Sequence, residues 1–544
     1  MRANLKLNSL KVVAKLAAAL VALGFATAHA AEINTSNAIE GDYLVKYAPN
    51  TSKLRSQAMV NLLPAGTKVS SLGLEGWIQV QVPKASIKSF GLNALSNMPG
   101  VVYAQPNYRI FLRESPSLVA LRAEVARVVA EHRAKGGNDD CPIPIPQLCD
   151  PNNGGGGGGI PGLPGQDQPP KDNPEIPGAT NPGSGSDPLI NKQWGMLDIG
   201  ATKVWNKNRG NEVVVAVIDT GVDYTHEDLV DNLWRNPGET GTDAQGRNKS
   251  SNQVDDDANG YVDDVVGWDF VSNDNKPFDL ASSPIELITG QGGNPGHGTH
   301  CAGNVGARGE NGKGISGVTP NAKIMGLRFL SEKGEGTTAG AVKAINYALK
   351  NGAQITSNSW GSEGEDPGES ADNKALHDAI QAAQDKGVLF IAAAGNGRQS
   401  NPMGQPEGYN NDTDAKPGMP ASLPYDIIIS VAATDSKGGL GSFSNYGKRT
   451  VHIGAPGVAV FSTTVGSHYS DTVIDMMGMK ATWDGTSMAT PHVAGAAALY
   501  IATHPNTTWK QVKNAILSSA TPTPSLTGKV STDGRLNVEG MLQK

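Results

Sequence analysis

From Leu189 to the C-terminus, short apolar runs alternate with stretches in which apolar residues recur at helical spacing. Runs of this kind are typical of strands buried on both faces of a parallel sheet. The clearest predicted strands are 213–218, 323–328, 388–393 and 427–432, and the clearest predicted helices are 337–351 and 373–386. This alternation predicts a doubly wound, mostly parallel α/β sheet, in which ligands lie beyond the carboxyl ends of the strands.

A second, smaller pattern of predicted strands and helices precedes this α/β region in the sequence. Strand-like and helix-like stretches follow one another in the order βαββαβ, at 42–47, from Thr51, and at 67–72, 76–82, 84–97 and 101–108. This order predicts a small ferredoxin-like α+β module. By itself the module indicates no function.

The segment between the two patterns changes character halfway. Residues 115–135 have apolar positions at helical spacing and predict one amphipathic helix. Residues 138–187 are dominated by Gly, Pro, Asn and Asp, with six consecutive glycines at 154–159. Such a composition buries too little apolar surface to fold, so it predicts a linker. We therefore expect a first domain over 31–112, a helix and linker over 113–186 and a second domain over 187–544.

The N-terminus has the pattern of a secretory signal peptide. Basic residues precede an apolar run at 16–26, which is followed by the small-x-small sequence Ala28-His29-Ala30. The alternative is an uncleaved anchor, but the run is about half the ~20 residues that a spanning helix needs. We expect cleavage after residue 30 and release to the extracellular medium, the periplasm or the cell surface.

Composition excludes some function classes. The net charge is −7, only 18% of residues are charged and no basic stripe is present, so nucleic acid is not an expected partner. The chain has three cysteines, too few for a disulfide scaffold. Cys141 and Cys149 are close enough in sequence to pair in an oxidising compartment, which leaves Cys301.

Three motifs carry candidate chemistry. Asp219 directly follows the predicted strand 213–218, His297 lies in Gly-His-Gly-Thr-His, and Ser487 begins a predicted helix rich in Ala and Gly. A serine hydroxyl is a poor nucleophile until an imidazole takes its proton, and the imidazole needs a buried carboxylate to hold its tautomer and stabilise its charge. In the chain order Asp, His, Ser, the three residues match a known template for a catalytic triad.

At these residues the chain resembles the subtilase family, in particular its subtilisin, thermitase and proteinase K branch. The resemblance covers roughly 187–542 and implies a serine endopeptidase that forms an acyl-enzyme on Ser487, acts on protein substrates with broad specificity and is a monomer. The first module, which closes with Gly-Val-Val-Tyr-Ala-Gln-Pro-Asn-Tyr at 100–108, resembles the family's inhibitory propeptide. This implies a zymogen that cleaves itself and whose prodomain inhibits and helps to fold the enzyme. Two alternatives stay open: a binding module on an inactive subtilase domain, and a processing protease for one partner.

The resemblance also implies further site residues. Asn396, in Gly-Asn-Gly, matches the family's oxyanion donor, and the Ser487 N–H would be the second donor. The segment Ser359-Trp360-Gly361 matches the strand that pairs with substrate and forms one wall of the specificity pocket, and Ala393-Ala394-Gly395 matches the other wall. Trp360 replaces a smaller apolar residue, so an altered pocket rim is expected.

Two calcium sites are expected. Asp255, Asp257, Asn259 and Asp263 reproduce the start of a calcium loop, but Val266 stands where its final Glu would be, and a solvated acidic turn is the alternative. The second site follows from the resemblance alone. Its ligands would be the side chains of Asp187, Asp228 and Asn311 and the carbonyls of Arg308, Lys313 and Ile315.

Cys301 lies one helical turn after His297. A buried thiol that acts only as a small apolar side chain is the expected role. Thiol reagents would then inhibit, if at all, by crowding the histidine.

Overall fold

The computed structural model describes residues 37–48, 61–134, 175–176, 185–206, 209–210, 212–361, 373–400, 405–476 and 479–544. The expected signal peptide, the pair Cys141 and Cys149, and the glycine run of the expected linker lie outside the described residues. Residues Ser36–Lys544 form one compact unit. Within the described ranges, no helix has both the length and the apolar character needed to cross a bilayer.

Four antiparallel strands near the N-terminus form a small sheet in the order β2-β3-β1-β4. They are β1 (Ala38–Tyr47), β2 (Lys68–Ser71), β3 (Trp77–Gln81) and β4 (Val101–Phe111). The helix predicted from Thr51 falls outside the described residues. The helix predicted over 84–97 is only a 3₁₀ turn, η1 (Lys84–Ser86), and a short helix, α3 (Leu92–Ser96). Gly91, the N-cap of α3, interrupts it, because glycine disfavours a helix interior.

The large sheet has nine strands in the order β17-β18-β12-β11-β10-β9-β5-β7-β6. All neighbours pair in parallel except β17 with β18. The strands are β5 (Val214–Asp219), β6 (Gly267–Asp269), β7 (Lys323–Arg328), β9 (Ile355–Asn358), β10 (Leu389–Ala393), β11 (Ile428–Thr434), β12 (Ile453–Pro456), β17 (Thr521–Pro522) and β18 (Gly534–Arg535). The predicted mostly parallel α/β fold is confirmed.

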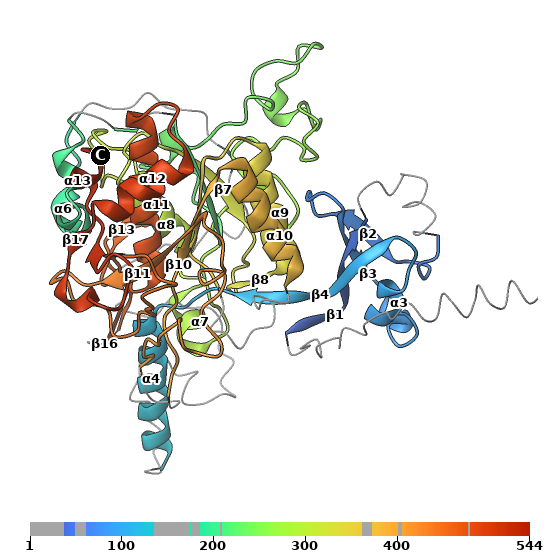
Figure 1. Ribbon diagram of the computed structural model, residues 1–544, viewed down its shortest axis with the longest axis horizontal. Coiled ribbons are helices and arrows are strands. Elements are labelled where there is room, and N and C mark those ends of the chain that lie inside the picture. Colours follow the sequence, from blue (N-terminus) through green and yellow to red (C-terminus); the bar gives the residue numbers. More distant parts are fainter. Residues whose placement is uncertain are drawn as a thin grey trace, which may run out of the picture. The chain divides into compact units, whose positions relative to one another are not determined.

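Helices surround this sheet, as Figure 1 shows. They are α6 (Trp194–Asp198), α7 (Pro284–Thr289), α8 (His297–Gly306), α9 (Thr338–Lys350), α10 (Lys374–Lys386), α11 (Thr486–Thr503), α12 (Trp509–Ser518) and α13 (Val538–Met541). Short turns η2 to η5 and η7 lie between them, at Ile190–Lys192, Ala201–Lys203, Val230–Asn232, Lys249–Ser251 and Pro524–Leu526. Two hairpins complete the fold: β13 (Ser462–Thr464) with β14 (His468–Ser470), and β15 (Thr472–Met476) with β16 (Met479–Thr482).

Helix α11 lies in the core of the large sheet's domain. Its residues from Thr486 to Tyr500 are all buried, as expected for a helix that is apolar on every side. Small residues let it approach its neighbours: a Cβ added to Gly495 would lie 2.7 Å from Val318 Cβ. The Ala- and Gly-rich sequence after Ser487 therefore holds the start of this helix in a fixed place.

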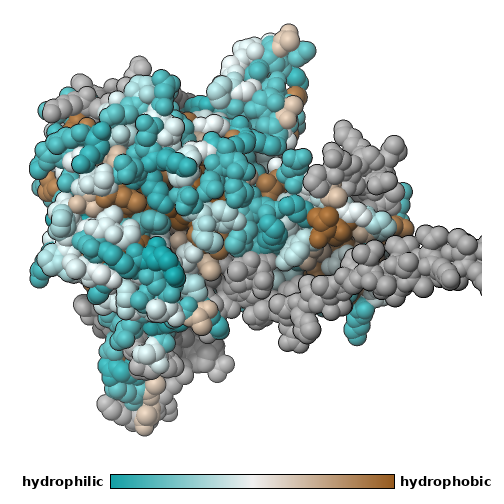
Figure 2. All heavy atoms as spheres, in the orientation of Figure 1, coloured by the Kyte–Doolittle hydropathy of each residue, from teal (hydrophilic) through white to brown (hydrophobic). Residues whose placement is uncertain are grey.

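The small sheet continues into the large domain through β4. The end of β4 pairs antiparallel with β8 (Glu335–Thr337), and the Leu112 N–H donates to the Gly334 carbonyl over 2.7 Å. Residues 112–115 connect β4 to α4 (Pro116–Ala134), which lies close to the helix predicted over 115–135. Figure 2 shows a face of the molecule on which hydrophilic residues predominate.

Candidate active site

Three adjacent parallel strands deliver the candidate residues to one edge of the large sheet. In the order β10-β9-β5, Asp219 is the last residue of β5, Ser359 directly follows β9, and Asn396 follows the end of β10 by three residues. The carboxyl ends of parallel strands meet at the same edge. The strand positions alone therefore bring together residues that lie far apart in the sequence.

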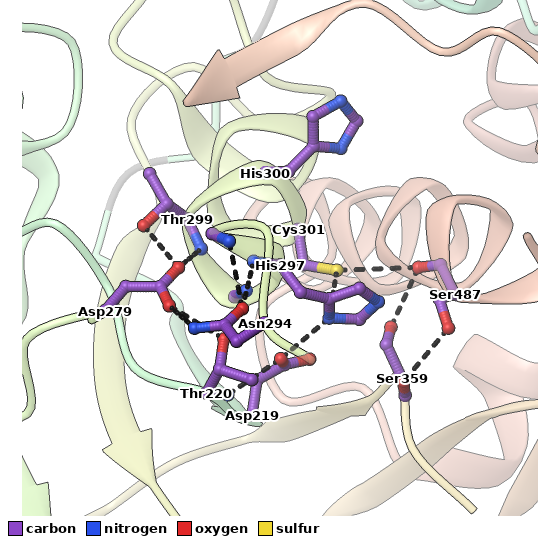
Figure 3. A network of polar contacts seen from close by, with 12 residues as sticks. Asp219, Thr220, Asp279, Asn294, His297, Thr299, His300, Cys301, Ser359 and Ser487 are labelled. Carbon is purple, nitrogen blue, oxygen red and sulfur yellow. Dashed lines mark hydrogen bonds and ion pairs between the residues drawn. The ribbon is translucent and has the colours of Figure 1, made fainter. Parts of the chain in front are cut away.

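His297 lies against Asp219. Its Nδ1 is 2.7 Å from Asp219 Oδ1, and both side chains are buried (Figure 3). Burial of the ring opposes its protonation, but the adjacent Asp219 carboxylate outweighs this and holds the pKa of His297 well above its usual value. The structure thus provides a basic imidazole oriented by a buried carboxylate.

Ser487 is the second residue of α11 and lies on the other side of the imidazole in Figure 3. Its Oγ donates to the Ser359 carbonyl over 3.0 Å, and the Ser359 Oγ donates to the Ser487 carbonyl over 2.8 Å. The buried Nε2 of His297 has no hydrogen-bond partner among the described residues. The Ser487 hydroxyl therefore points toward β9. The Nε2 atom of His297 is free to accept a hydrogen bond from it.

A buried carboxylate that the sequence analysis missed organises the start of α8. Asp279 accepts hydrogen bonds from the Thr299 N–H and hydroxyl, the Thr220 hydroxyl and the Asn294 amide, over 2.7–2.9 Å. Asn294 Oδ1 in turn accepts from the His297 N–H over 3.0 Å. Burial raises the pKa of Asp279 despite these bonds. No local motif marks Asp279 or Asn294, because their role depends on residues distant in sequence.

Asn396 and the Ser487 main chain lie near one another at the same edge. Asn396 Oδ1 accepts from the Thr486 N–H over 2.9 Å and from its hydroxyl over 2.8 Å, so Nδ2 remains as the donor of this side chain. A Cβ built on Gly485 would lie 3.3 Å from Asn396 Nδ2 and 3.5 Å from the Ser487 nitrogen. This arrangement offers two N–H donors close to the nucleophile candidate.

The chain's own segment between β4 and α4 runs across this edge. A pocket beside His297 is lined by Leu112, Arg113, Glu114 and Ser115 on one side and by residues of the large domain that include Trp483 and Met488 on the other. Asn396 Nδ2 donates to the Glu114 carbonyl over 3.3 Å. Residues 112–115, which connect β4 to α4, therefore cover the candidate site.

Of the six expected pocket-wall residues, the two glycines face this segment. The Gly361 and Gly395 main chains lie against the Arg113 side chain, and Ala393 and Ala394 are fully buried. The Trp360 side chain does not form a rim. It is fully buried and packs edge-on against Phe329 and Phe390, with ring centroids 5.0 and 6.4 Å away.

The residues of the calcium site implied by the resemblance are gathered around Asp228. Its carboxylate accepts from Asn311 Nδ2 over 2.7 Å and from the Ile315 N–H over 2.8 Å, and the Arg308 N–H donates to its carbonyl over 2.7 Å. The Lys313 N–H donates to Asn311 Oδ1. Asp187 Oδ1 is buried and has no partner among the described residues. Burial, with Asp228 nearby, raises the pKa of Asp187 to about 6.

The four residues of the expected calcium loop are not gathered as one ligand set. Asp255 accepts from the nearby Asn259 and Gly260 N–H groups, and Asp263 accepts from the Gln253 N–H, ten residues earlier in the chain. Asp257 instead lies with Glu239 and Asp264, whose carboxylate oxygens are all within 4.8 Å of one another.

Two observations make this second group a candidate cation site. Glu239 is fully buried and its Oε2 has no partner in the described part of the chain, and burial raises the pKa of Asp264 to about 7. The sequence analysis missed Glu239 because it lies well before the acidic loop. It missed Asp264 because position 263 fits the loop pattern better.

Cys301 is fully buried. Its Sγ lies 3.9 Å from His297 Nδ1 and 3.6 Å from the Ser487 carbonyl, and burial raises the pKa of the thiol. A raised pKa keeps the thiol protonated and unreactive. This environment suits a small buried side chain behind the histidine.

Comparison with known proteins gives one consistent family. A family model described as "Subtilase family" matches residues 210–540. Thermitase of Thermoactinomyces vulgaris is 33% identical over 58% of this chain and 84% of its own length. A thermophilic serine proteinase of Bacillus sp. (strain AK1) is 33% identical over 63% of this chain and 65% of its own. Subtilisin DY of Bacillus licheniformis is 32% identical over 60% of this chain and 91% of its own.

Proposed function

This chain belongs to the subtilase family and is a serine endopeptidase, and we propose that Asp219, His297 and Ser487 are its catalytic triad. The observation that carries the proposal is the buried pair of Asp219 and His297 beside Ser487, with a free Nε2 on the imidazole.

In the proposed reaction, the Ser487 side chain turns from the Ser359 carbonyl to His297 Nε2. His297 takes the hydroxyl proton while Oγ bonds to the scissile carbonyl carbon, and Asp219 stabilises the imidazolium. The imidazolium then gives that proton to the leaving amine as the peptide bond breaks. Water, deprotonated by the same imidazole, hydrolyses the acyl-enzyme and releases Ser487.

Asn396 Nδ2 and the Ser487 N–H are the proposed oxyanion donors. Both nitrogens are held near the nucleophile, Asn396 by its two hydrogen bonds from Thr486. Preorganised donors of this kind are worth about 2.7–4 kcal/mol each in the transition state. Asn396 already holds a main-chain carbonyl, that of Glu114, which supports this role.

We propose further that the chain is a zymogen whose residues 31–112 form an inhibitory prodomain. Two observations support inhibition. The segment 109–112 pairs with 334–337 next to the site, and 112–115 line the pocket beside His297. A substrate would need this same space.

Helix α4 extends the cover beyond the pocket. One face of the helix is buried against the large domain through Leu118, Leu121, Val125 and Val129. The hydroxyls of Ser115 and Ser117 donate to the Thr482 carbonyl in β16, over 2.8 and 2.9 Å. Residues 112–115 therefore cover the pocket beside His297, and α4 covers the neighbouring surface that includes β16.

A folding role for the prodomain rests on helix capping. The Ala339 N–H near the start of α9 donates to Asn107 Oδ1 over 3.0 Å, and the Ala375 N–H near the start of α10 donates to Gln105 Oε1 over 2.9 Å. Both acceptors belong to β4 and are buried. The first N–H groups of a helix lack intrahelical partners, so these contacts stabilise both helices while the prodomain is bound.

Recognition through main-chain pairing selects little sequence, so we propose that many different proteins are substrates. We propose that the protein is secreted, on the basis of the signal-peptide pattern at its N-terminus. We also propose that it is a monomer, as the sequence analysis expects. The inactive scaffold and the single-partner processing enzyme remain the alternatives.

We propose structural calcium at two places, one held by Asp187, Asp228 and Asn311 and one by Glu239, Asp257 and Asp264. Their oxygen donors suit a hard cation. The unpartnered Asp187 Oδ1 and Glu239 Oε2 are the atoms that a cation would satisfy.

Self-processing tests the proposal. The precursor without residues 1–30 is produced as wild type and as Ser487→Ala, and both are followed by gel electrophoresis, mass spectrometry and casein hydrolysis. We expect the wild type to cut itself and digest casein while Ser487→Ala stays full length and inactive. If the wild type does not cut itself, and still does not digest casein after an external protease has nicked 135–174, the inactive scaffold is correct.

A further inference from the structure

The Arg113 side chain lies against the segments that follow β9 and β10. Arg113 is 5% exposed although it carries a charge at the surface edge of the sheet. A Cβ built on Gly361 would lie 2.4 Å from Arg113 Nη2, and one built on Gly395 would lie 2.5 Å from Arg113 Nη1. The guanidinium therefore lies between the main chains of two glycines, one from each of the segments that follow β9 and β10.

Both glycines adopt positive φ angles, +154° and +124°. A side chain at either position would enter the space that the guanidinium fills, so the two bare main chains form a slot for a flat group. At the slot's end, Arg113 Nη2 donates to the Met419 carbonyl over 2.9 Å. The slot thus offers both a flat shape and an acceptor for a planar donor.

This slot lies next to the reacting atoms. Gly361 is two residues from Ser359, whose carbonyl accepts the Ser487 hydroxyl. Gly395 precedes Asn396, whose amide holds the Glu114 carbonyl. A residue with its side chain in the slot therefore has its main chain beside the nucleophile.

On the basis of the proposed function, we propose that the slot is a recognition site for arginine and that the enzyme cuts itself between Arg113 and Glu114. In substrates, the same slot selects proteins and peptides with arginine on the amino side of the scissile bond. Lysine is second best, because its point charge fills a flat slot less well than a planar guanidinium does.

Of the contacts around this bond, the side-chain contacts favour it and one main-chain contact favours the next bond. The Glu114 side chain points to α4, where its oxygens accept from Arg122 Nη1 over 2.7 and 2.8 Å, so it does not occupy the slot. The carbonyl that Asn396 holds is that of Glu114, one residue further along. A cut after Arg113 thus requires the Arg113 carbonyl to replace that of Glu114 at Asn396 while the Arg113 side chain stays in the slot, and a cut after Glu114 would contradict the proposal.

The first experiment locates the cut. Wild-type precursor is allowed to process itself, and mass spectrometry identifies the ends of the fragments. We expect an N-terminal fragment that ends at Arg113, cutting at the same bond but less than about tenfold slower in Arg113→Lys, and cutting slowed at least about tenfold in Arg113→Asp, since a carboxylate would face the Met419 carbonyl. Arg109→Ala is the matched control: this arginine is exposed on β4, four residues before Arg113, and its loss leaves the rate unchanged.

The second experiment does not depend on how a variant folds. The self-processed wild-type enzyme is given synthetic peptides of the sequence 110–118, which lacks Arg109, with Arg, Lys, Tyr, Phe or Ala at position 113. We expect kcat/KM to be highest for Arg, followed by Lys, and at least about tenfold lower for Phe and Ala. Tyr is included because its ring is flat and its hydroxyl could donate to Met419.

The outcomes separate this inference from the proposed function. If the enzyme cleaves the peptides but prefers Phe, Tyr or Ala, or cuts after another residue, the arginine site is wrong and the serine protease stands. If it neither processes itself nor cleaves any of the peptides, the proposed function is wrong and the arginine site falls with it.

Discussion

At the scale of single residues, His297 is fixed from two sides. Asp219 holds its Nδ1, and Asn294, oriented by Asp279, holds its main-chain N–H. Since the ring and its main chain are both anchored, Nε2 is the one polar atom of this residue left for chemistry. A base placed this firmly loses little entropy when the reaction begins.

Asp219→Asn should lower kcat by about four orders of magnitude, because an amide favours the wrong tautomer of His297. The substitution should also change the pH profile. The carboxylate raises the pKa of His297, and only the neutral ring is a base, so wild-type activity should rise with pH through a midpoint above the ordinary histidine value of about 6.5. In Asp219→Asn this midpoint should move to lower pH. An unchanged midpoint would show that the two residues are not coupled.

Asn396→Ala should reduce kcat by about 10²–10³-fold with little change in KM, because its Nδ2 donor acts on charge that develops only in the transition state. Steady-state kinetics on a peptide substrate separates the two constants. A loss confined to KM would mean that Asn396 binds substrate and does not stabilise the oxyanion.

At the scale of elements, the order β10-β9-β5 explains why the site lies where it does. Strands 213–218, 323–328, 388–393 and 427–432 and helices 337–351 and 373–386 were predicted to within about two residues, since buried parallel strands leave a strong apolar signal. The sequence predicted Asp219, His297 and Ser487 as site residues because the small residues that must flank them form recognisable motifs. The roles of Asp279, Asn294 and Glu239 could not be predicted from the sequence, because each acts only through contacts between distant segments.

Helix α4 is the element whose role the structure adds. Its buried face carries Leu121 and Val125, and its exposed face carries the ion pairs of Arg127 with Glu124 and Glu131. The sequence predicted the helix but not what it covers, because a periodic pattern shows a buried face and not its partner.

The double variant Leu121→Glu, Val125→Glu should release α4, since charge cannot be buried in its docking face. Precursor that has not yet been processed should then hydrolyse a small peptide reporter at least about tenfold faster, which corresponds to about 1.4 kcal/mol of lost docking. Glu124→Gln with Glu131→Gln is the matched control on the exposed face and should change nothing. Equal rates for all three precursors would show that α4 does not restrict access.

At the scale of the whole molecule, the two proposed calcium sites join segments that are distant in the sequence. Asp187 lies at the start of the large domain, and Asp228 and Asn311 lie within it, so a shared cation would tie the domain's first residues to its core. The cation would add to the main-chain hydrogen bonds that already join Gly185 to Glu310 and Leu189 to Gly314.

Calcium should therefore raise the thermal midpoint of the Ser487→Ala protein, which does not digest itself. A cation present at 100 times its Kd adds about 2.7 kcal/mol of stability by mass action. Differential scanning calorimetry should show a smaller calcium-dependent shift in Asp187→Asn and in Glu239→Gln. Asp385→Asn, on the exposed face of α10, is the control and should keep the full shift. Should chelation leave the midpoint of every variant unchanged, neither group of residues binds calcium.

The central claim is that Ser487 is the nucleophile, activated by His297 and Asp219. The most direct measurement is the reaction of the self-processed enzyme with a fluorophosphonate probe, followed by mass spectrometry of the labelled peptide. The account predicts one adduct, on Ser487, whose formation is abolished by denaturation and falls by orders of magnitude when a His297→Ala precursor, nicked by an external protease, is used instead. An active enzyme that carries no adduct on Ser487, or labelling of equal rate without His297, would contradict it.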